Sequence, residues 1–224
     1  MTTSTGGDPE PRAGRALRRD AEENRLRVIR AAREVFAAQG LGAGFNDIAR
    51  HAGVGVGTVY RRFPDKATLV REALEEPLAR ILEVADDAIA TEPAWDGLML
   101  LIRHAADVLA ANLGLRDIAL GPGQLAPELD EAAGRVAPYL EELLRRAQDE
   151  GSVRPGITAQ DFTMLFFMIS ELAMHAADTR PQAYRRYLTI FTDGLRASGA
   201  DAPLPEPLSA QDADAVARHW TSRA

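Results

Sequence analysis

Apolar residues recur every three or four positions through most of the chain, and this periodicity restricts the fold more than any other feature of the sequence. Leu26, Ile29, Ala32 and Phe36 give the first example, because they fall on one face of a helix that Gly40 can end. No segment shows the sustained alternation of apolar and polar residues that is typical of a strand. The sequence therefore predicts an all-α fold.

The expected helices differ in length along the chain. Two short segments, 45–53 and 56–63, follow the first helix. Pro64 then interrupts the chain, and Asp65 is a suitable N-cap for a helix that begins at Lys66. The remaining long helices are expected at about 66–90, 95–112, 128–150, 159–178 and 182–197, with the third either kinked or restarted at Pro138.

The composition excludes several kinds of site and location. The 224 residues include no cysteine, so the chain has no disulfide framework and no thiolate nucleophile or metal ligand. The first twenty residues contain no apolar run, unlike a signal peptide, and no stretch approaches the roughly 18 apolar residues of a membrane span. We therefore expect a cytoplasmic protein that does not bind a membrane.

The charge of the chain is distributed unevenly. The net charge is −7, but residues 1–75 carry 13 Arg and Lys against 10 Asp and Glu, whereas residues 76–224 carry 13 against 23. A basic first third on an acidic remainder is typical of a module that meets a polyanion, attached to a body that does not. Chance asymmetry is the alternative.

The stretch GVGVGTVYRRFPDK, residues 53–66, raises the possibility of a phosphate-binding loop. A dinucleotide fingerprint needs Gly-x-Gly-x-x-Gly after a strand, but here Thr58 stands where the third glycine belongs and the preceding segment, NDIARHA, is helical. No Gly-Lys-Ser/Thr sequence of a P-loop is present either. The glycines therefore have another purpose.

A helix-turn-helix explains the same residues. Gly53 supplies the turn, Ala49 is small enough for two steeply crossing helices to touch, and Val54 and Val59 fill the space between them. The second helix then presents small, hydroxylated, aromatic and cationic groups near its N-terminus, where they can meet a major groove and phosphates: Gly57, Thr58, Tyr60 and Arg61.

This region resembles the DNA-binding domain of TetR-type transcriptional regulators. The resemblance covers roughly residues 24–74 and rests on several elements in order: RVIRAAREVFAAQG, DIARHAGV, GTVY and FPDK. Two positions depart from the family pattern. AGFND stands where Ser or Thr usually opens the second helix, so that Asn46 is the expected cap, and Gly55 replaces the usual turn serine.

The resemblance implies specific DNA contacts. Tyr60 and Lys66, the only lysine, would bind phosphates, Thr58 and Arg61 would bind phosphates or base edges, and Val56 would touch a thymine methyl. The alternative for each position is an ordinary surface residue. The predicted DNA-binding residues are Asn46, Gly55, Val56, Gly57, Thr58, Tyr60, Arg61 and Lys66.

The resemblance also implies that the later helices form a ligand chamber and a dimer interface. The helix over 159–178 is apolar nearly all round, so it must be covered on more than one side. The predicted interface residues are Phe162, Phe166, Ile169, Tyr184, Leu188, Phe191 and Leu195. The residues expected to line an apolar pocket, with core packing as the alternative, are Trp95, Met99, His104, Met164, Phe167 and Met168.

Together these features predict a regulator, not an enzyme, that uses no cofactor or metal. A homodimer would bind a near-palindromic operator in double-stranded DNA and act as a repressor released by a small apolar or amphipathic effector. The alternative is a helical enzyme or metal-dependent sensor using His104, His175 and Glu171, of which the last two have metal-ligand spacing. The expected domains are a disordered tail (1–20), a three-helix helix-turn-helix domain (21–74), a larger ligand-binding and dimerisation domain (75–198), and a Pro-rich linker with a short helix (199–224).

Pro77 lies in the middle of the helix expected over 66–90, which joins the two domains. It would either bend this helix and set the resting angle of a lever, or open a separate helix after a break at Glu76.

Overall fold

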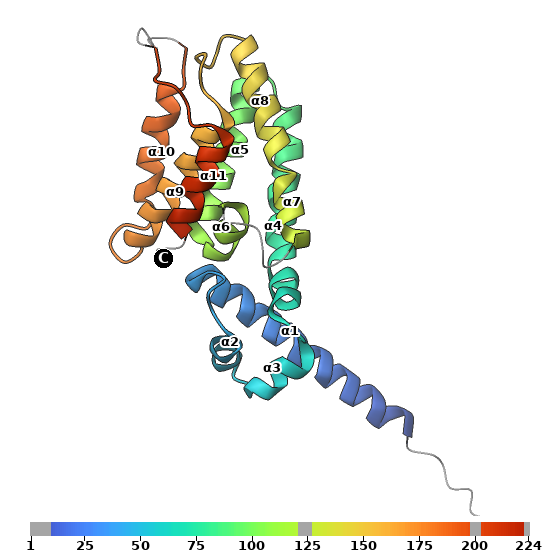
Figure 1. The fold of residues 1–224 in the computed structure, drawn as a ribbon. Helices are drawn as coiled ribbons and strands as arrows, with labels where there is room; N and C mark the ends of the chain where they lie inside the picture. Colours follow the sequence, from blue (N-terminus) through green and yellow to red (C-terminus); the bar gives the residue numbers. More distant parts are fainter. Residues whose placement is uncertain (1–9, 121–126, 198–202, 222–224) are drawn as a thin grey trace, which may run out of the picture.

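The computed structural model describes residues 10–120, 127–197 and 203–221, and it confirms the all-α prediction. Within those ranges every regular element is a helix, apart from an isolated bridge between Val153 and Arg196 (Figure 1). The helices are α1 (Glu10–Gln39), α2 (Phe45–Ala52), α3 (Val56–Arg62), α4 (Lys66–Ala90), α5 (Ala94–Ala111), α6 (Leu113–Leu120), α7 (Pro127–Gly134), α8 (Ala137–Asp149), α9 (Ala159–His175), α10 (Ala183–Gly194) and α11 (Ala210–Thr221).

The first helix begins earlier than the sequence analysis predicted. Residues 10–20 belong to α1, so the expectation of a disordered tail is wrong for them, while residues 1–9 lie outside the described ranges. The physical reason is local. Alanine, leucine and arginine are strong helix formers, and Pro11 stands in the first turn, where its missing N–H costs no hydrogen bond.

Two other boundaries were left open or missed. α7 ends at Gly134 and α8 begins at Ala137, with Pro138 in its first turn, so the restart was the correct alternative. The separate helix α6 was not expected. It begins directly after α5 because the Asn112 side chain accepts a hydrogen bond from the Leu115 amide at 3.0 Å, which caps the new helix.

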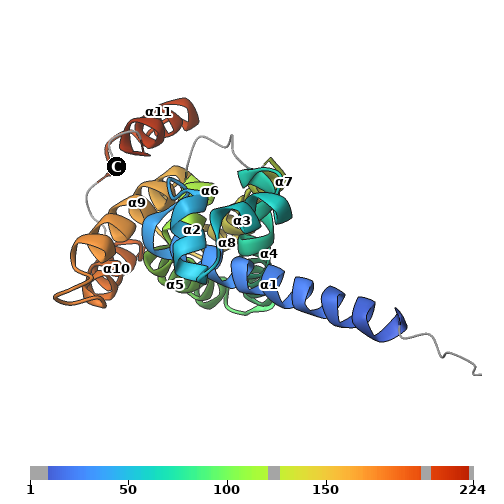
Figure 2. The same cartoon turned by 90° about the horizontal axis from the view of Figure 1, so that it is seen from below.

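The helices form a small head and a larger body (Figures 1 and 2). We call α1–α3 the head and α4–α11 the body. α5 is central in the body, packed against α4, α8 and α9, while α1 contacts both α4 and α6. Viewed from below, α2 and α3 face the reader, and the N-terminal half of α1 projects to one side (Figure 2).

A polar joint connects the head to the body through α6. The Leu41 amide, just after α1, donates to Asp117 Oδ2 at 2.8 Å. Arg116, only 7% exposed, binds Asp117 Oδ1 at 3.1 Å and Glu171 Oε1 on α9 at 3.2 Å. The approach is close enough that a Cβ on Gly40 would come within 2.5 Å of the Asp117 carboxylate. Polar contacts therefore run without interruption from the head through α6 to α9.

Pro77 lies inside α4, which runs continuously from Lys66 to Ala90. The proline is therefore not the start of a separate helix. It has no N–H to donate to the Ala73 carbonyl four residues earlier. Arg33 of α1 takes over this role: its Nε donates to Ala73 O at 3.1 Å, and its Nη1 pairs with Glu76 at 2.7 Å. The head is thus fastened to α4 at the point where α4 lacks its own hydrogen bond.

This arrangement predicts energetic coupling between Arg33 and Pro77. Arg33→Leu should destabilise the protein by about 1–2 kcal/mol more in the wild-type background than in Pro77→Ala, because the substituted alanine supplies an N–H to the Ala73 carbonyl. Denaturant unfolding of the two single variants and the double variant measures this coupling. Additive effects, within about 0.5 kcal/mol, would contradict the compensation.

Candidate nucleic-acid interface

The segment from α2 to α3 forms a helix-turn-helix. Gly53 has φ 67° and ψ 33°, the left-handed conformation that glycine adopts without strain, and the Val54 amide donates to Ala49 O at 3.0 Å. Ala49 is buried against the turn, and Val59 of α3 is fully buried. The turn, the small contact residue and the anchor therefore lie where the sequence placed them.

The N-terminus of α2 differs from the prediction. The N-cap residue is Gly44, and Asp47 Oδ2 accepts a hydrogen bond from the Gly44 amide at 3.1 Å. This bond, followed by the one from Arg50, lowers the pKa of Asp47. Asn46 lies one residue inside the helix and is exposed, so it is not the cap. The DNA contact predicted for Asn46 stays a prediction, now for an exposed side chain in the first turn of α2.

The packing of the head requires neither Gly55, the N-cap residue of α3, nor Gly57 within this helix. A Cβ added to Gly55 or to Gly57 would meet no atom within 4 Å, and neither residue has a positive φ. Glycine in a helix costs about 1 kcal/mol relative to alanine, so Gly57 is unfavourable for the isolated chain. Its absence of a side chain instead suits a partner that approaches the backbone closely.

Val56, Tyr60 and Arg61 of the predicted contact set are also exposed, whereas Thr58 is half-buried. Tyr60 is 61% exposed and meets the ring of Phe45 edge to face, with centroids 4.8 Å apart. Arg61 Nη2 donates to Thr58 Oγ1 at 3.3 Å. No described residue forms an ion pair with Arg61 or Arg62, so both guanidinium groups are available to anions. Arg62 was missed, although it continues the basic run after Tyr60.

Lys66 has an intramolecular partner that the sequence did not reveal. Its ammonium donates to the backbone carbonyl of Leu41, in the loop after α1, and partial burial lowers its pKa. In this structure the lysine ties that loop to the start of α4, beside Asp65, which accepts from the Thr68 amide at 2.7 Å. The predicted phosphate contact of Lys66 stays a prediction, and it would compete with the bond to Leu41.

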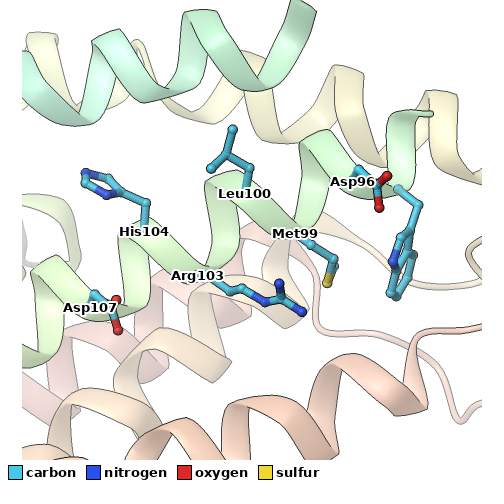
Figure 3. A pocket seen from close by; sticks show the side chains of 7 residues that line it. Asp96, Met99, Leu100, Arg103, His104 and Asp107 are labelled. Atoms are coloured by element: carbon cyan, nitrogen blue, oxygen red, sulfur yellow. The ribbon is translucent and has the colours of Figure 1, made fainter. Parts of the chain in front are cut away.

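The predicted pocket residues divide into two groups. Trp95, Met99 and His104 line a groove of about 470 Å³ on α5 (Figure 3), which we call the α5 groove. Phe167 is instead buried in the core and Met168 is 49% exposed on α9, and neither they nor Met164 line this groove. The sequence analysis missed four lining residues that follow the same helical face: Asp96, Leu100, Arg103 and Asp107.

The polar side chains of the α5 groove differ in their hydrogen bonding. Asp107 accepts from the Tyr184 hydroxyl at 2.6 Å and from Arg185 Nη2 at 3.0 Å. Burial, together with the bond to Asp107, raises the pKa of Tyr184, so the hydroxyl remains a donor. The Nε2 atom of His104 is buried and has no hydrogen-bond partner among the described residues.

Most residues of the predicted dimer seam are buried within the protomer, so that interface stays a prediction. Its members pack into the protomer's own core: Phe162, Ile169, Tyr184, Leu188 and Leu195 are at most 5% exposed, Phe166 is 9% exposed, and Phe191 is partly buried against them. The six that are at most 9% exposed are therefore out of reach of a second copy in this arrangement, whereas Phe191 is partly accessible. The large apolar side chains that α9 and α10 expose are Met168, Tyr187 and Ile190.

Two of the three residues of the enzyme or metal-sensor alternative are engaged in other contacts. Glu171 already pairs with Arg116, and His175 Nδ1 lies 2.9 Å from the Glu171 backbone oxygen. No three His, Asp or Glu side chains in the described ranges are placed to hold a metal ion. By length and composition no single described helix could cross a bilayer; α5 and α6 pass that test only as a pair, bent by 120°.

Comparison with protein families decides between the two interpretations. Residues 28–73 match the family of bacterial regulatory proteins of the tetR type, and residues 94–197 match the C-terminal domain of SbtR-like transcriptional regulators. Together the two matches cover more than half of the chain. The chain belongs to the TetR family. This confirms the prediction that the protein is a helix-turn-helix transcriptional regulator rather than an enzyme.

Individual transcriptional regulators are also similar to this chain. The regulator SrpR of Pseudomonas putida is 31% identical over 147 residues, which cover 60% of this chain and 65% of SrpR. UidR of Escherichia coli K12 is 23% identical over 81% of this chain and 93% of its own length. The ketosteroid transcriptional regulator KstR2 of Mycobacterium tuberculosis shares the fold, with a TM-score of 0.56, 20% identity, and coverage of 86% of this chain and 99% of KstR2.

Proposed function

We propose that this TetR-family protein is a dimeric repressor that binds a near-palindromic operator through α3 and leaves it when a small amphipathic molecule binds the body. The observation that carries the DNA-binding part is the exposed face of α3. An added side chain at Gly57 would meet no atom of the protein within 4 Å, and the two arginines that follow form no ion pair with any described residue. Such a face is better suited to contact with a nucleic-acid backbone than to simple exposure to solvent.

The geometry of α3 suits entry into a major groove. The helix has seven residues, and its first turn presents Val56, Gly57 and Thr58 to the outside, while Val59 anchors it from within. In a helix-turn-helix the N-terminal residues of the second helix meet base edges, and neighbouring cations meet phosphates. A dimer would place two such helices about 34 Å apart, on successive turns of one face of the duplex.

The dimer surface that we propose is the exposed apolar face of α9 and α10. Met168, Tyr187 and Ile190 are each about half exposed, and Tyr187 and Ile190 are one turn apart on α10. Large apolar side chains gathered on neighbouring helices mark association surfaces. Paired with a second copy, the two helices would form a four-helix arrangement.

The response to a ligand would travel through elements that are in direct contact. α5, which carries the groove, packs on α4 and α9, and the Asp117 joint links α6 to the loop after α1. A ligand that favours one arrangement of these helices changes the angle of the head and therefore operator affinity. Pro77 and Arg33 lie where α4 meets the head, which supports the role of α4 as the lever.

Selection of bound fragments from genomic DNA by the purified protein tests this function. We expect a near-palindromic sequence, and binding that weakens steeply as salt concentration rises, because phosphate contacts release counterions. Alanine in place of both Arg61 and Arg62 should flatten the salt dependence by about two units. Recovery of no preferred sequence would contradict the proposed function.

A further inference from the structure

We propose that the α5 groove binds an amphipathic carboxylate, with Arg103 holding the carboxylate and the apolar surface toward Trp95 holding the body of the molecule. The inference rests on the proposed function, because it names the class of effector for the same site. Three features carry it: a guanidinium with no partner among the described residues, a neighbouring carboxylate whose oxygens already accept hydrogen bonds, and an apolar floor of limited length.

Arg103 is the cationic group that the groove offers to a ligand. It is exposed, and no described residue makes a hydrogen bond or ion pair with it. Figure 3 shows its side chain extended beside Met99, on the same side of α5. A planar guanidinium binds a carboxylate through two parallel hydrogen bonds, a geometry that a neutral amide cannot match.

The acidic residue nearest to Arg103 along α5 does not neutralise it. Asp107 is one turn away, at the spacing where helix ion pairs form. Its two oxygens are instead bound by Tyr184 and by Arg185, with Nε 3.1 Å from Oδ1 and Nη2 3.0 Å from Oδ2. Arg185 thus occupies the carboxylate, and the charge of Arg103 remains for an incoming anion.

The second acidic residue lies at the opposite end of the groove. Asp96 stands in the first turn of α5, seven residues before Arg103, where the helix dipole favours its negative charge. Close to it, the Arg196 guanidinium carbon lies 4.1 Å from the centre of the Trp95 ring, so a cation is also present at this end. Arg196 is stacked on the Trp95 ring, whereas Arg103 has no stacking or ion-pair partner among the described residues, so we place the carboxylate at Arg103.

The apolar floor between the two ends sets the length of the ligand. Trp95 and Arg103 are eight residues apart, about 12 Å along the axis at 1.5 Å per residue. The Arg103 side chain extends back along α5 beside Met99 (Figure 3), so the apolar stretch between its guanidinium and Trp95 is shorter than this rise. Met99 and Leu100 lie between them on the groove. An unbranched acid of at most about ten carbons fits along this stretch.

Calorimetry with decanoate and with its neutral analogue decanamide tests the inference. Decanoate should bind the wild type at least about tenfold more tightly than decanamide, because only the carboxylate makes charge-assisted bonds. In Arg103→Gln the two compounds should bind equally. Arg186→Gln, which removes the same charge from an exposed position on α10 outside the groove, should leave the preference unchanged.

Three outcomes would overturn the inference: no saturable binding of decanoate at millimolar concentration, equal binding of both compounds to the wild type, or an unchanged preference in Arg103→Gln. Each variant must first show the same thermal unfolding temperature as the wild type. Selection of bound genomic DNA in the absence of decanoate tests operator binding independently, so the effector class and the proposed function can fail separately. Operator binding without decanoate binding overturns only the effector class, whereas decanoate binding without any operator overturns only the regulator.

Discussion

Replacing Gly57 by leucine is expected to lower operator affinity by at least about 100-fold, because several phosphate and base contacts near the start of α3, each contributing about 1–3 kcal/mol, would be held apart. The fold should persist. A Cβ at this position meets no atom within 4 Å, and the backbone has ordinary helical geometry. Leucine is a better helix former than glycine, so the thermal stability should be unchanged or slightly higher.

The matched control is Gly134→Leu. Gly134 is also an exposed helical glycine with no atom within 4 Å of an added Cβ, but it ends α7 in the body. Operator binding by fluorescence anisotropy and unfolding by circular dichroism are measured for both variants. We expect both to fold and only Gly57→Leu to lose DNA. Wild-type affinity in Gly57→Leu would mean that α3 does not approach DNA at this residue.

The sequence predicted the head well because its determinants are local. The turn at Gly53, the anchor Val59 and the cap Asp65 each depend on residues within five positions along the chain. The cap of α2 was missed although it is equally local. Asn46 and Asp47 are both capable side chains, and only the backbone geometry at Gly44 shows that the aspartate is used.

The body was predicted less completely because its decisive contacts are distant in sequence. Asp107 is 77 residues from Tyr184, and Leu41 is 76 residues from Asp117. Helical periodicity identified the apolar seam of α10 that includes Leu188, but it cannot tell whether such a seam faces the protomer's own core or a partner. Burial in the folded chain settles that question for Leu188, and it leaves Tyr187 and Ile190 outside.

The exposed apolar face of α9 and α10 can be tested as a dimer interface by a single substitution. Ile190→Arg is expected to convert a dimer into a monomer at micromolar concentration. Ile190 is 56% exposed in the protomer, at the border of a groove that Leu204 and Leu208 also line, so an arginine there can reach solvent and the fold is expected to persist. In the proposed interface the same arginine would be buried against apolar side chains of a second copy, and burying an unpaired charge costs several kcal/mol. Sedimentation velocity measures the change of oligomeric state.

Operator affinity should fall with the loss of the dimer. Two linked heads bind a palindrome with an advantage of about 10²–10⁴ over one head, and this advantage disappears in a monomer. Ala79→Arg, which adds the same charge at an exposed position on α4, should remain dimeric and bind DNA normally. Leu188 and its seam partners are buried within the protomer. If the Ile190→Arg variant remained a dimer, neither face of α10 would form the interface, and the association would have to involve another part of the body.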